Sequence, residues 1–256
     1  MVQALTSKPT ILWVNGSFTP ASYYATMAEN VRSQGYEIVV DTLPSSARTP
    51  PEQPATMTED ADFFHDIAEK LADQGKDIVL VMHSYGGVPG TECSKGLSKA
   101  DRQEAGKPGG IIRLVYLTCV VPDVGVPMKE SVPPLPFIIG REDGFMEHIP
   151  EESAPYTFSD LPREEGIEWV RKMPLHSQVS FEGKLTYPGY KYIPSSWILC
   201  ERDELLPPDF QRNCIELIEK QSGKKVDVYN FDAAHCPNIS APKELADIVI
   251  QAVAAA

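Results

Sequence analysis

Hydrophobic residues fall into short continuous runs along this chain instead of alternating with polar residues. The runs cover residues 10–15, 36–40, 77–82, 111–121, 195–200 and 226–231. Such runs are typical of strands that are buried on both faces of a parallel sheet. Segments with apolar residues near helical spacing separate them, at residues 20–34, 58–74, 89–104, 208–220 and 241–253. This alternation predicts an α/β fold with a mostly parallel six-stranded sheet and helices on both faces.

Two segments depart from the alternation. Residues 43–54 contain four prolines, which predicts a surface loop because proline cannot donate to a sheet ladder. Residues 122–194 are rich in Pro, Gly, Tyr and acidic residues, with a hairpin expected at residues 142–144 and a helix at 162–173. We therefore expect a core made of residues 1–121 and 195–256, with residues 122–194 inserted as a cap.

The third apolar run breaks abruptly into the motif HSYGG at residues 83–87. The motif is close to the Gly-x-Ser-x-Gly nucleophile elbow, in which a strained strand-to-helix turn exposes the serine hydroxyl. Met82 stands where the first glycine of that pattern is usual. The alternative for Ser84 is a place on an ordinary buried turn, and this motif alone does not decide between the two.

Polar residues follow several predicted strands, at the edge where ligands bind in open parallel sheets. Ser17 follows the first strand, Ser84 the third, the acids at 201–203 the fifth and His235 the last. The order serine, acid, histidine is the one found in α/β-hydrolases. Further acids lie close by in the sequence, namely Glu204 and Asp232.

Three segments together resemble a known family. They are HSYGG at 83–87, CERDELLPP at 200–208 with FQR at 210–212, and YPGYKYIPSS at 187–196. They are similar to the α/β-hydrolase superfamily, and within it to the compact branch of small plant esterases and hydroxynitrile lyases. The resemblance spans nearly the whole chain. It implies the α/β-hydrolase fold and cleavage of a small or medium carboxylic ester, lactone or thioester.

The resemblance also implies a role for each matched residue. Ser84 would be the nucleophile, His235 the general base, and Asp203 the acid that orients the imidazole. The backbone N–H groups of Ser17 and Tyr85 would form the oxyanion hole. No cofactor is implied. A lyase or acyl cyclase that uses the same residues, or a ligand-binding protein without turnover, are the alternatives.

Residues next to these positions are candidates for the substrate pocket: Gly16, Phe18, His83, Cys119 and Cys236. For His83 we favour a supporting place under the elbow, and for the two cysteines that of small buried hydrophobic residues. Hydroxynitrile lyases of this branch resemble one another in a Lys after the catalytic His and a Thr after the first strand. Cys236 and Gly16 occupy those places here, which favours ester hydrolysis. The expected cap holds further candidates for contact with the substrate, and the sequence does not choose among them: His148, Tyr156, Trp169 and His176.

Composition narrows the class of partner. A formal net charge of −13 argues against nucleic acid or an anionic membrane surface, because both require clustered cations. No apolar run reaches the roughly 18 residues of a membrane span. Five cysteines without C-x-x-C spacing, and histidines without ligand spacing, indicate reduced thiols and no metal site. We expect a cytoplasmic protein with a small-molecule substrate, and a homodimer is the assembly considered.

Overall fold

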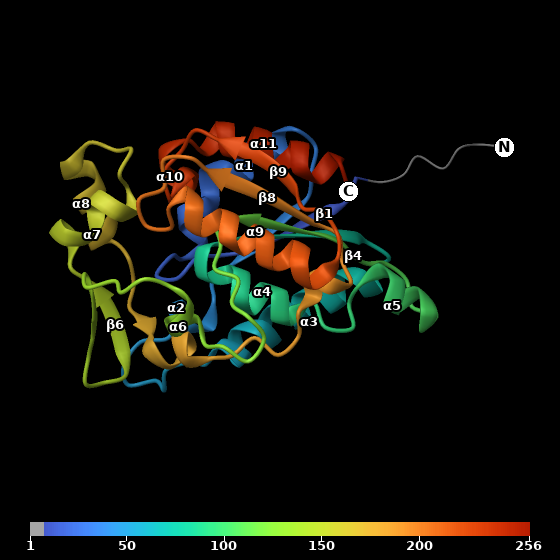
Figure 1. The fold of residues 1–256 in the computed structure, drawn as a ribbon, viewed down its shortest axis with the longest axis horizontal. Helices are drawn as coiled ribbons and strands as arrows, with labels where there is room; N and C mark the ends of the chain where they lie inside the picture. The colour runs from blue at the N-terminus through green and yellow to red at the C-terminus, as the bar shows by residue number, and fades with distance from the viewer. Residues whose placement is uncertain (1–7) are drawn as a thin grey trace.

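Six parallel strands form the central sheet of the computed structural model, which describes residues 8–256 (Figure 1). Their order across the sheet is β2-β1-β3-β4-β8-β9. The strands are β1 (Thr10–Val14), β2 (Ile38–Asp41), β3 (Asp77–His83), β4 (Gly110–Leu117), β8 (Ser195–Cys200) and β9 (Asp227–Phe231). The continuous apolar runs of β1, β3 and β8 are buried, whereas the edge strand β9 is largely exposed. The predicted parallel sheet is therefore confirmed.

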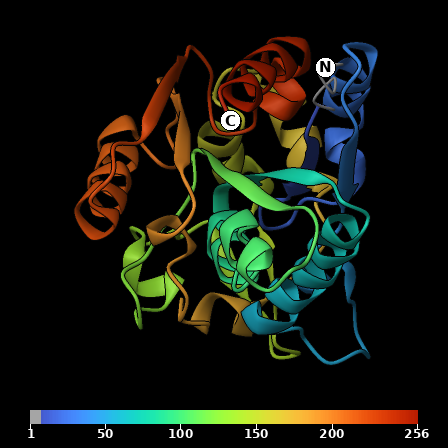
Figure 2. The same cartoon turned by 90° about the vertical axis from the view of Figure 1, so that its right-hand side faces the viewer.

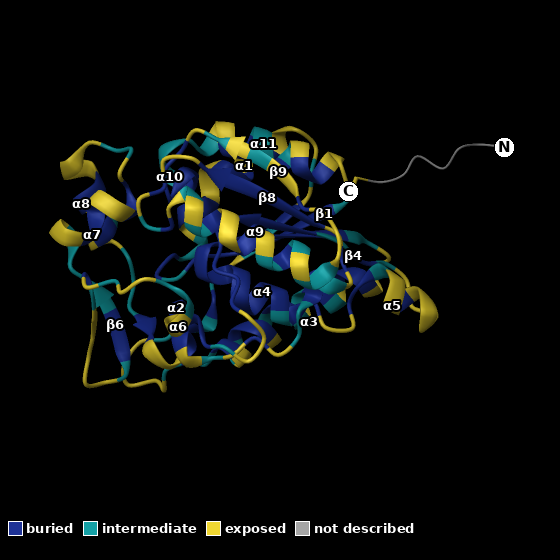
Figure 3. Cartoon of the chain, in the orientation of Figure 1, coloured by how far each residue is buried: buried dark blue, intermediate teal, exposed yellow. Residues whose placement is uncertain are grey.

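Helices cover both faces of this sheet (Figure 2). On one face lie α1 (Ala25–Ser33) and α11 (Pro242–Ala254), and on the other lie α3 (Met57–Asp73), α4 (Gly87–Cys93) and α9 (Pro208–Ser222). Alternate strand residues face the two helical layers: Leu80 and Met82 pack on one side, Val79 and Val81 on the other. Figure 3 shows that the strands are buried while the helices expose their outer sides.

Several element boundaries differ from those expected. The helix predicted over residues 89–104 is wrong as one element, because the chain divides at Gly96 (φ +70°) into α4 and α5 (Lys99–Glu104). The helix expected over 20–34 begins with the 3-10 turn η1 (Ala21–Tyr24). The strand expected over 111–121 ends at Leu117, because Thr118 adopts a positive φ of 38°. The prolines of residues 43–54 do not exclude helix, since Pro44 is the first residue of the short α2 (Pro44–Ala47).

The segment between β4 and β8 carries a small sheet of its own. β5 (Ile138–Gly140), β6 (Phe145–His148) and β7 (His176–Ser177) pair in an antiparallel manner. The expected hairpin is the β5–β6 pair, with Gly144 (φ +84°) in its turn. The helices of the segment are α6 (Met128–Ser131), α7 (Pro150–Thr157) and α8 (Arg163–Arg171), followed by the 3-10 turns η3 (Gln178–Glu182) and η4 (Gly189–Lys191). Figure 1 shows α7, α8 and β6 at one end of the molecule, near α10 (Pro237–Ser240).

A helix that crosses a bilayer needs about 20 consecutive, mostly apolar residues. Among residues 8–256, no helix combines the length and apolar character that crossing a bilayer requires.

Candidate active site

Ser84 lies on a strained turn between β3 and α4. It is the first residue of the 3-10 turn η2 (Ser84–Gly86), and its φ is 54°, a conformation uncommon for residues other than glycine. A Cβ atom on Gly86 would lie 2.4 Å from the Asn15 carbonyl oxygen. A Cβ atom on Gly87 would lie 2.7 Å from the Val120 carbonyl oxygen. The two glycines therefore let the turn pass against the neighbouring strand ends.

Met82 is accommodated by a third glycine. The Met82 side chain is fully buried, and a Cβ atom on Gly90 would lie 2.6 Å from its Cγ and 2.7 Å from its Sδ. The absence of a side chain on α4 thus provides the space that the methionine occupies. This explains how the turn forms although Met82 replaces the usual first glycine.

The structure brings the three residues of the predicted triad into one hydrogen-bonded chain. His235 Nε2 lies 2.9 Å from Ser84 Oγ, and His235 Nδ1 lies 2.7 Å from Asp203 Oδ2. All three residues are at least nine-tenths buried, with exposed fractions of 8%, 3% and 2% for Ser84, His235 and Asp203. The neighbouring acids are exposed to solvent instead: Glu201, Glu204 and Asp232.

Three donors hold the Asp203 carboxylate. The backbone N–H groups of Leu205 and Leu206 donate to Oδ1 over 2.8 and 2.9 Å, and the Thr118 hydroxyl donates to Oδ2. Thr118 was not among the residues expected at the site, because it lies inside the strand predicted over residues 111–121, whereas the observed strand ends one residue before it. These contacts leave Oδ2 facing His235, which fixes the orientation of the imidazole.

Two backbone N–H groups lie free beside Ser84. Among residues 8–256, the N–H groups of Ser17 and Tyr85 meet no protein acceptor, whereas the N–H of Gly16 donates to the Tyr24 hydroxyl over 3.0 Å. Ser17 belongs to the loop after β1, and Tyr85 is the second residue of η2. Both groups are therefore available to a bound ligand.

His83 lies next to His235, with 5.2 Å between the two ring centres. Its Nε2 donates to the His235 carbonyl oxygen over 2.9 Å, and its Nδ1 accepts from the Tyr24 hydroxyl over 2.8 Å. Burial, with a smaller effect from the charge of His235, lowers the pKa of His83 to about 3. His83 is thus a neutral imidazole whose hydrogen bonds position the backbone of His235.

Tyr85 reaches a second buried polar cluster that the sequence analysis missed. Its hydroxyl donates to Asp60 Oδ2 over 2.8 Å, and the Ser45 backbone and hydroxyl donate to the same carboxyl group over 2.8 and 2.6 Å. Asp60 has no solvent-exposed surface, and burial raises its pKa to about 6. In the sequence, the one sign of this role is that Asp60 is an acid within the apolar stripe of the helix predicted over residues 58–74.

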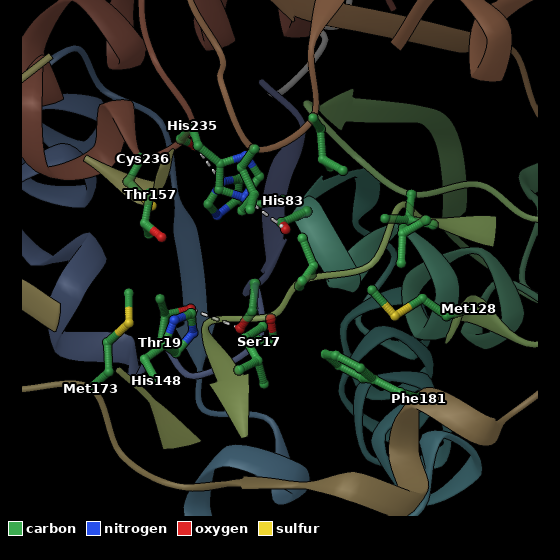
Figure 4. A pocket seen from close by; sticks show the side chains of 18 residues that line it. Ser17, Thr19, His83, Met128, His148, Thr157, Met173, Phe181, His235 and Cys236 are labelled. Carbon is green, nitrogen blue, oxygen red and sulfur yellow. Dashed lines mark hydrogen bonds between the residues drawn. The ribbon is translucent and has the colours of Figure 1, made fainter. Parts of the chain in front are cut away.

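A pocket opens above Ser84 (Figure 4). Its lining includes Gly16, His83 and Cys236, as expected. Phe18 and Cys119, the other two candidates, are not part of the lining. The Phe18 ring packs behind the wall, 4.3 Å from the His148 ring, and the Cys119 thiol donates to the Met82 carbonyl oxygen over 3.1 Å.

Residues of the inserted segment form much of the pocket wall. The pocket holds about 530 Å³ of space not occupied by protein atoms, part of it open to solvent. Its apolar residues include Met128, Val132, Leu135, Ile138, Met173 and Phe181. Of the four aromatic and histidine residues left open in this segment, His148 alone is part of the lining among the residues described. Figure 4 shows His148 and Thr157 across the pocket from Met128 and Phe181.

Within residues 8–256, no group of three or more His, Cys, Asp or Glu is arranged to hold a metal ion. No Lys, Arg, Asp or Glu is among the described residues that line the pocket. The Cys236 thiol lines the pocket, and burial raises its pKa well above the ordinary value, so that it stays protonated.

Comparisons with known proteins concern the family and the fold. Residues 11–248 match the family model described as "Alpha/beta hydrolase family". A protein named "Probable hydrolase R7" from Phoma sp. is 34% identical over 247 residues, which cover 96% of this chain and 98% of that protein. Among solved structures, a pyrethroid hydrolase from Sphingobium faniae is similar with a TM-score of 0.72 at 20% identity, covering 97% of this chain and 98% of the other.

A plant esterase shares the same fold. The structure of polyneuridine aldehyde esterase is similar with a TM-score of 0.72 at 16% identity, covering 96% of this chain and 99% of the other. At this identity the likeness concerns the fold alone, while the family match and the Phoma relative extend over nearly the whole chain. The protein therefore belongs to the alpha/beta hydrolase family.

Proposed function

We propose that the protein is a serine hydrolase that cleaves a small or medium carboxylic ester, lactone or thioester through an acyl-serine intermediate. The observation that carries this proposal is the hydrogen-bonded chain from Ser84 Oγ through His235 to Asp203, with Ser84 next to two free N–H groups. In this arrangement a hydroxyl has a base within reach of its proton and donors near the oxygen of a bound carbonyl.

Acylation follows from these contacts. Ser84 Oγ attacks the carbonyl carbon while its proton passes to His235 Nε2, 2.9 Å away. Negative charge develops on the carbonyl oxygen and is stabilised by the N–H groups of Ser17 and Tyr85, each worth roughly 3 kcal/mol in comparable sites. Asp203 keeps the Nδ1 proton in place and stabilises the imidazolium. His235 then gives its proton to the leaving alcohol or thiol.

Deacylation uses the same groups in reverse. His235 Nε2 accepts a proton from a water molecule, whose oxygen attacks the acyl carbon of the Ser84 ester. The carbonyl oxygen returns to the N–H groups of Ser17 and Tyr85. When the intermediate collapses, His235 returns the proton to Ser84 Oγ, and the carboxylic acid leaves. No cofactor takes part in these steps.

The chemistry of the pocket supports hydrolysis over the lyase alternative. A cyanide leaving group calls for a cation beside it, and no Lys or Arg is among the described lining residues. Relatives and structural neighbours carry the words hydrolase and esterase in their names, which agrees with ester cleavage. We also propose that residues 122–194 act as the cap of this site and that the protein works in the cytoplasm, where its five free cysteines stay reduced.

Labelling with a fluorophosphonate tests the proposal. We expect the probe to modify Ser84 and to abolish hydrolysis of p-nitrophenyl acetate, and we expect Ser84→Ala to escape labelling and lose turnover. Ser33→Ala, which removes an exposed hydroxyl at the end of α1 outside the pocket lining, is the control that should keep both properties. Equal turnover by wild type and Ser84→Ala would refute the proposal. Labelling of Ser84 without any ester turnover would favour a lyase or a ligand-binding protein instead.

A further inference from the structure

His148 is a third histidine that lines the pocket, beside His235 and His83, and the proposed mechanism does not use it. It is the last residue of β6, and its ring packs against Phe18 at 4.3 Å and against Phe137 at 6.2 Å between ring centres. Its side chain lines the pocket above Ser84. The two aromatic neighbours hold the ring in one place, so that its nitrogens have fixed directions.

One nitrogen of His148 is bound and the other is free. His148 Nδ1 lies 2.6 Å from Ser153 Oγ, which lies 3.0 Å from Thr157 Oγ1. Among residues 8–256, no protein group is hydrogen-bonded to His148 Nε2. His148 is only partly buried, so water can pair with Nε2 while the pocket is open. A ligand that displaces this water without offering a partner would leave the nitrogen unpaired, which costs about 1–3 kcal/mol. The site therefore favours a ligand that brings a partner for Nε2.

The two hydroxyl groups let His148 act as donor or acceptor. If Thr157 donates to Ser153 and Ser153 to Nδ1, the ring proton is on Nε2, which then donates. If Nδ1 donates to Ser153 and Ser153 to Thr157, Nε2 accepts. Either hydrogen-bond direction leaves the imidazole neutral. Nε2 therefore suits a hydroxyl group, which does both, or a carbonyl oxygen, which accepts.

The surroundings of His148 disfavour an anionic partner. Burial, with a smaller effect from the charge of His235, lowers the pKa of His148 to about 4. The imidazole is consequently uncharged at neutral pH and offers no ion pair to a carboxylate or phosphate. Among the described residues, no Lys or Arg lines the pocket, so no other side chain supplies an ion pair to such a group.

We propose that His148 Nε2, oriented by Ser153 and Thr157, is a subsite for an uncharged oxygen, hydroxyl or carbonyl, that the substrate carries in addition to its scissile group. This inference rests on the proposed ester hydrolysis and names the substrate class: an apolar body that fits against Met128 and Phe181, with one oxygen substituent directed to the opposite wall (Figure 4). A purely hydrocarbon ester would leave Nε2 unpaired.

Matched pairs of esters test this subsite. Each pair of p-nitrophenyl or acetate esters differs by one keto oxygen, placed on the acyl or on the alcohol side, and the ratio of kcat/KM for the keto member to that for the hydrocarbon member is measured. His148→Phe keeps an aromatic ring but removes both nitrogens. We expect it to lower this ratio about ten-fold for at least one pair, as the loss of one hydrogen bond predicts, and His148→Gln to restore part of it.

His65→Phe provides the control. His65 lies on α3, where its Nδ1 contacts the Cys93 carbonyl oxygen outside the pocket, and this variant should leave every ratio unchanged. The subsite is refuted if every ratio in His148→Phe equals that of wild type. This includes the case in which kcat/KM falls equally for both members of each pair. If wild type hydrolyses no pair, the proposed function fails by itself. The subsite is then tested by binding. The dissociation constants of both members of each pair are measured with Ser84→Ala and with the double variant Ser84→Ala/His148→Phe, and the ratio of the keto to the hydrocarbon member is compared between the two proteins.

Discussion

Gly90→Ala should destabilise this protein because of Met82, although alanine is normally the better helix residue. Alanine in place of glycine inside a helix gains about 1 kcal/mol. Here the new Cβ would lie 2.6 Å from Met82 Cγ and 2.7 Å from Sδ, in a fully buried region. Overpacking of this kind costs about 1–3 kcal/mol. We therefore expect a net loss of about 1 kcal/mol in the free energy of unfolding.

The sign should reverse when Met82 is shortened. In a Met82→Ala background the nearest remaining atom for the new Cβ is Val14 Cγ2 at 3.4 Å, an ordinary contact. Gly90→Ala should then stabilise by about 1 kcal/mol, although Met82→Ala alone costs about 2–5 kcal/mol. The coupling energy between the two positions is thus about 2 kcal/mol.

Urea unfolding of wild type, both single variants and the double variant measures this coupling, with tryptophan fluorescence as the probe and equal m-values as the condition for comparison. Gly90→Ala would have the same effect in both backgrounds if Met82 did not depend on the space left by Gly90. That result would refute our explanation of how the turn at Ser84 forms without its usual first glycine.

Other substitutions test the proposed chemistry and the buried acid. His235→Ala should lower kcat on p-nitrophenyl acetate by about 10⁴-fold or more, whereas Cys236→Ala should change it only a few-fold; a severe loss in Cys236→Ala would contradict a protonated, passive thiol. Asp203→Asn should lower kcat by about 10⁴-fold because the imidazole loses its orienting acceptor, and near-normal turnover would show that another group holds the ring. Burial raises the pKa of the Asp60 carboxyl from 3.8 to about 6, so the folded protein favours the protonated form. The contribution of this group to the free energy of unfolding is complete below about pH 4, and about 3 kcal/mol of it is lost as the pH rises through 6. Between pH 4 and 7 the difference in unfolding free energy should shift by that amount in favour of Asp60→Asn, and a difference independent of pH would refute this assignment.

Much of the core was predictable because its signals are local. The strand expected at residues 195–200 has those bounds in the structure, since a short run of apolar and small residues between two turns has few other places to be buried. The helix at 208–220 ends two residues later than expected, at Ser222 before Gly223 with φ +68°. By contrast, residues 89–104 were expected to form one helix, and the break at Gly96 became visible only in the structure.

The candidate site was predictable in part. Parallel strands end at the same edge of the sheet, so Ser84, Asp203 and His235 could be expected together once the strands were known. The positions of Phe18 and Cys119 could not be predicted. The backbone angles of a loop decide whether a side chain points into the pocket or packs behind its wall. Thr118 was missed for the same reason, since its orientation depends on the positive φ that ends β4.

The sequence by itself determined the order of strands and helices, the chain order of serine, acid and histidine, and the acidic character of the surface, because each depends on residue type and spacing. Only the tertiary structure decided how Met82 is accommodated, which residues of the segment 122–194 line the pocket, and that Asp60 is buried. Gly90 leaves room for Met82 because α4 packs against β3, and His148 lines the same pocket as Ser84 although the two lie in segments far apart in the chain. Contacts between segments far apart in the chain are set by packing of the whole molecule, and no local pattern records them.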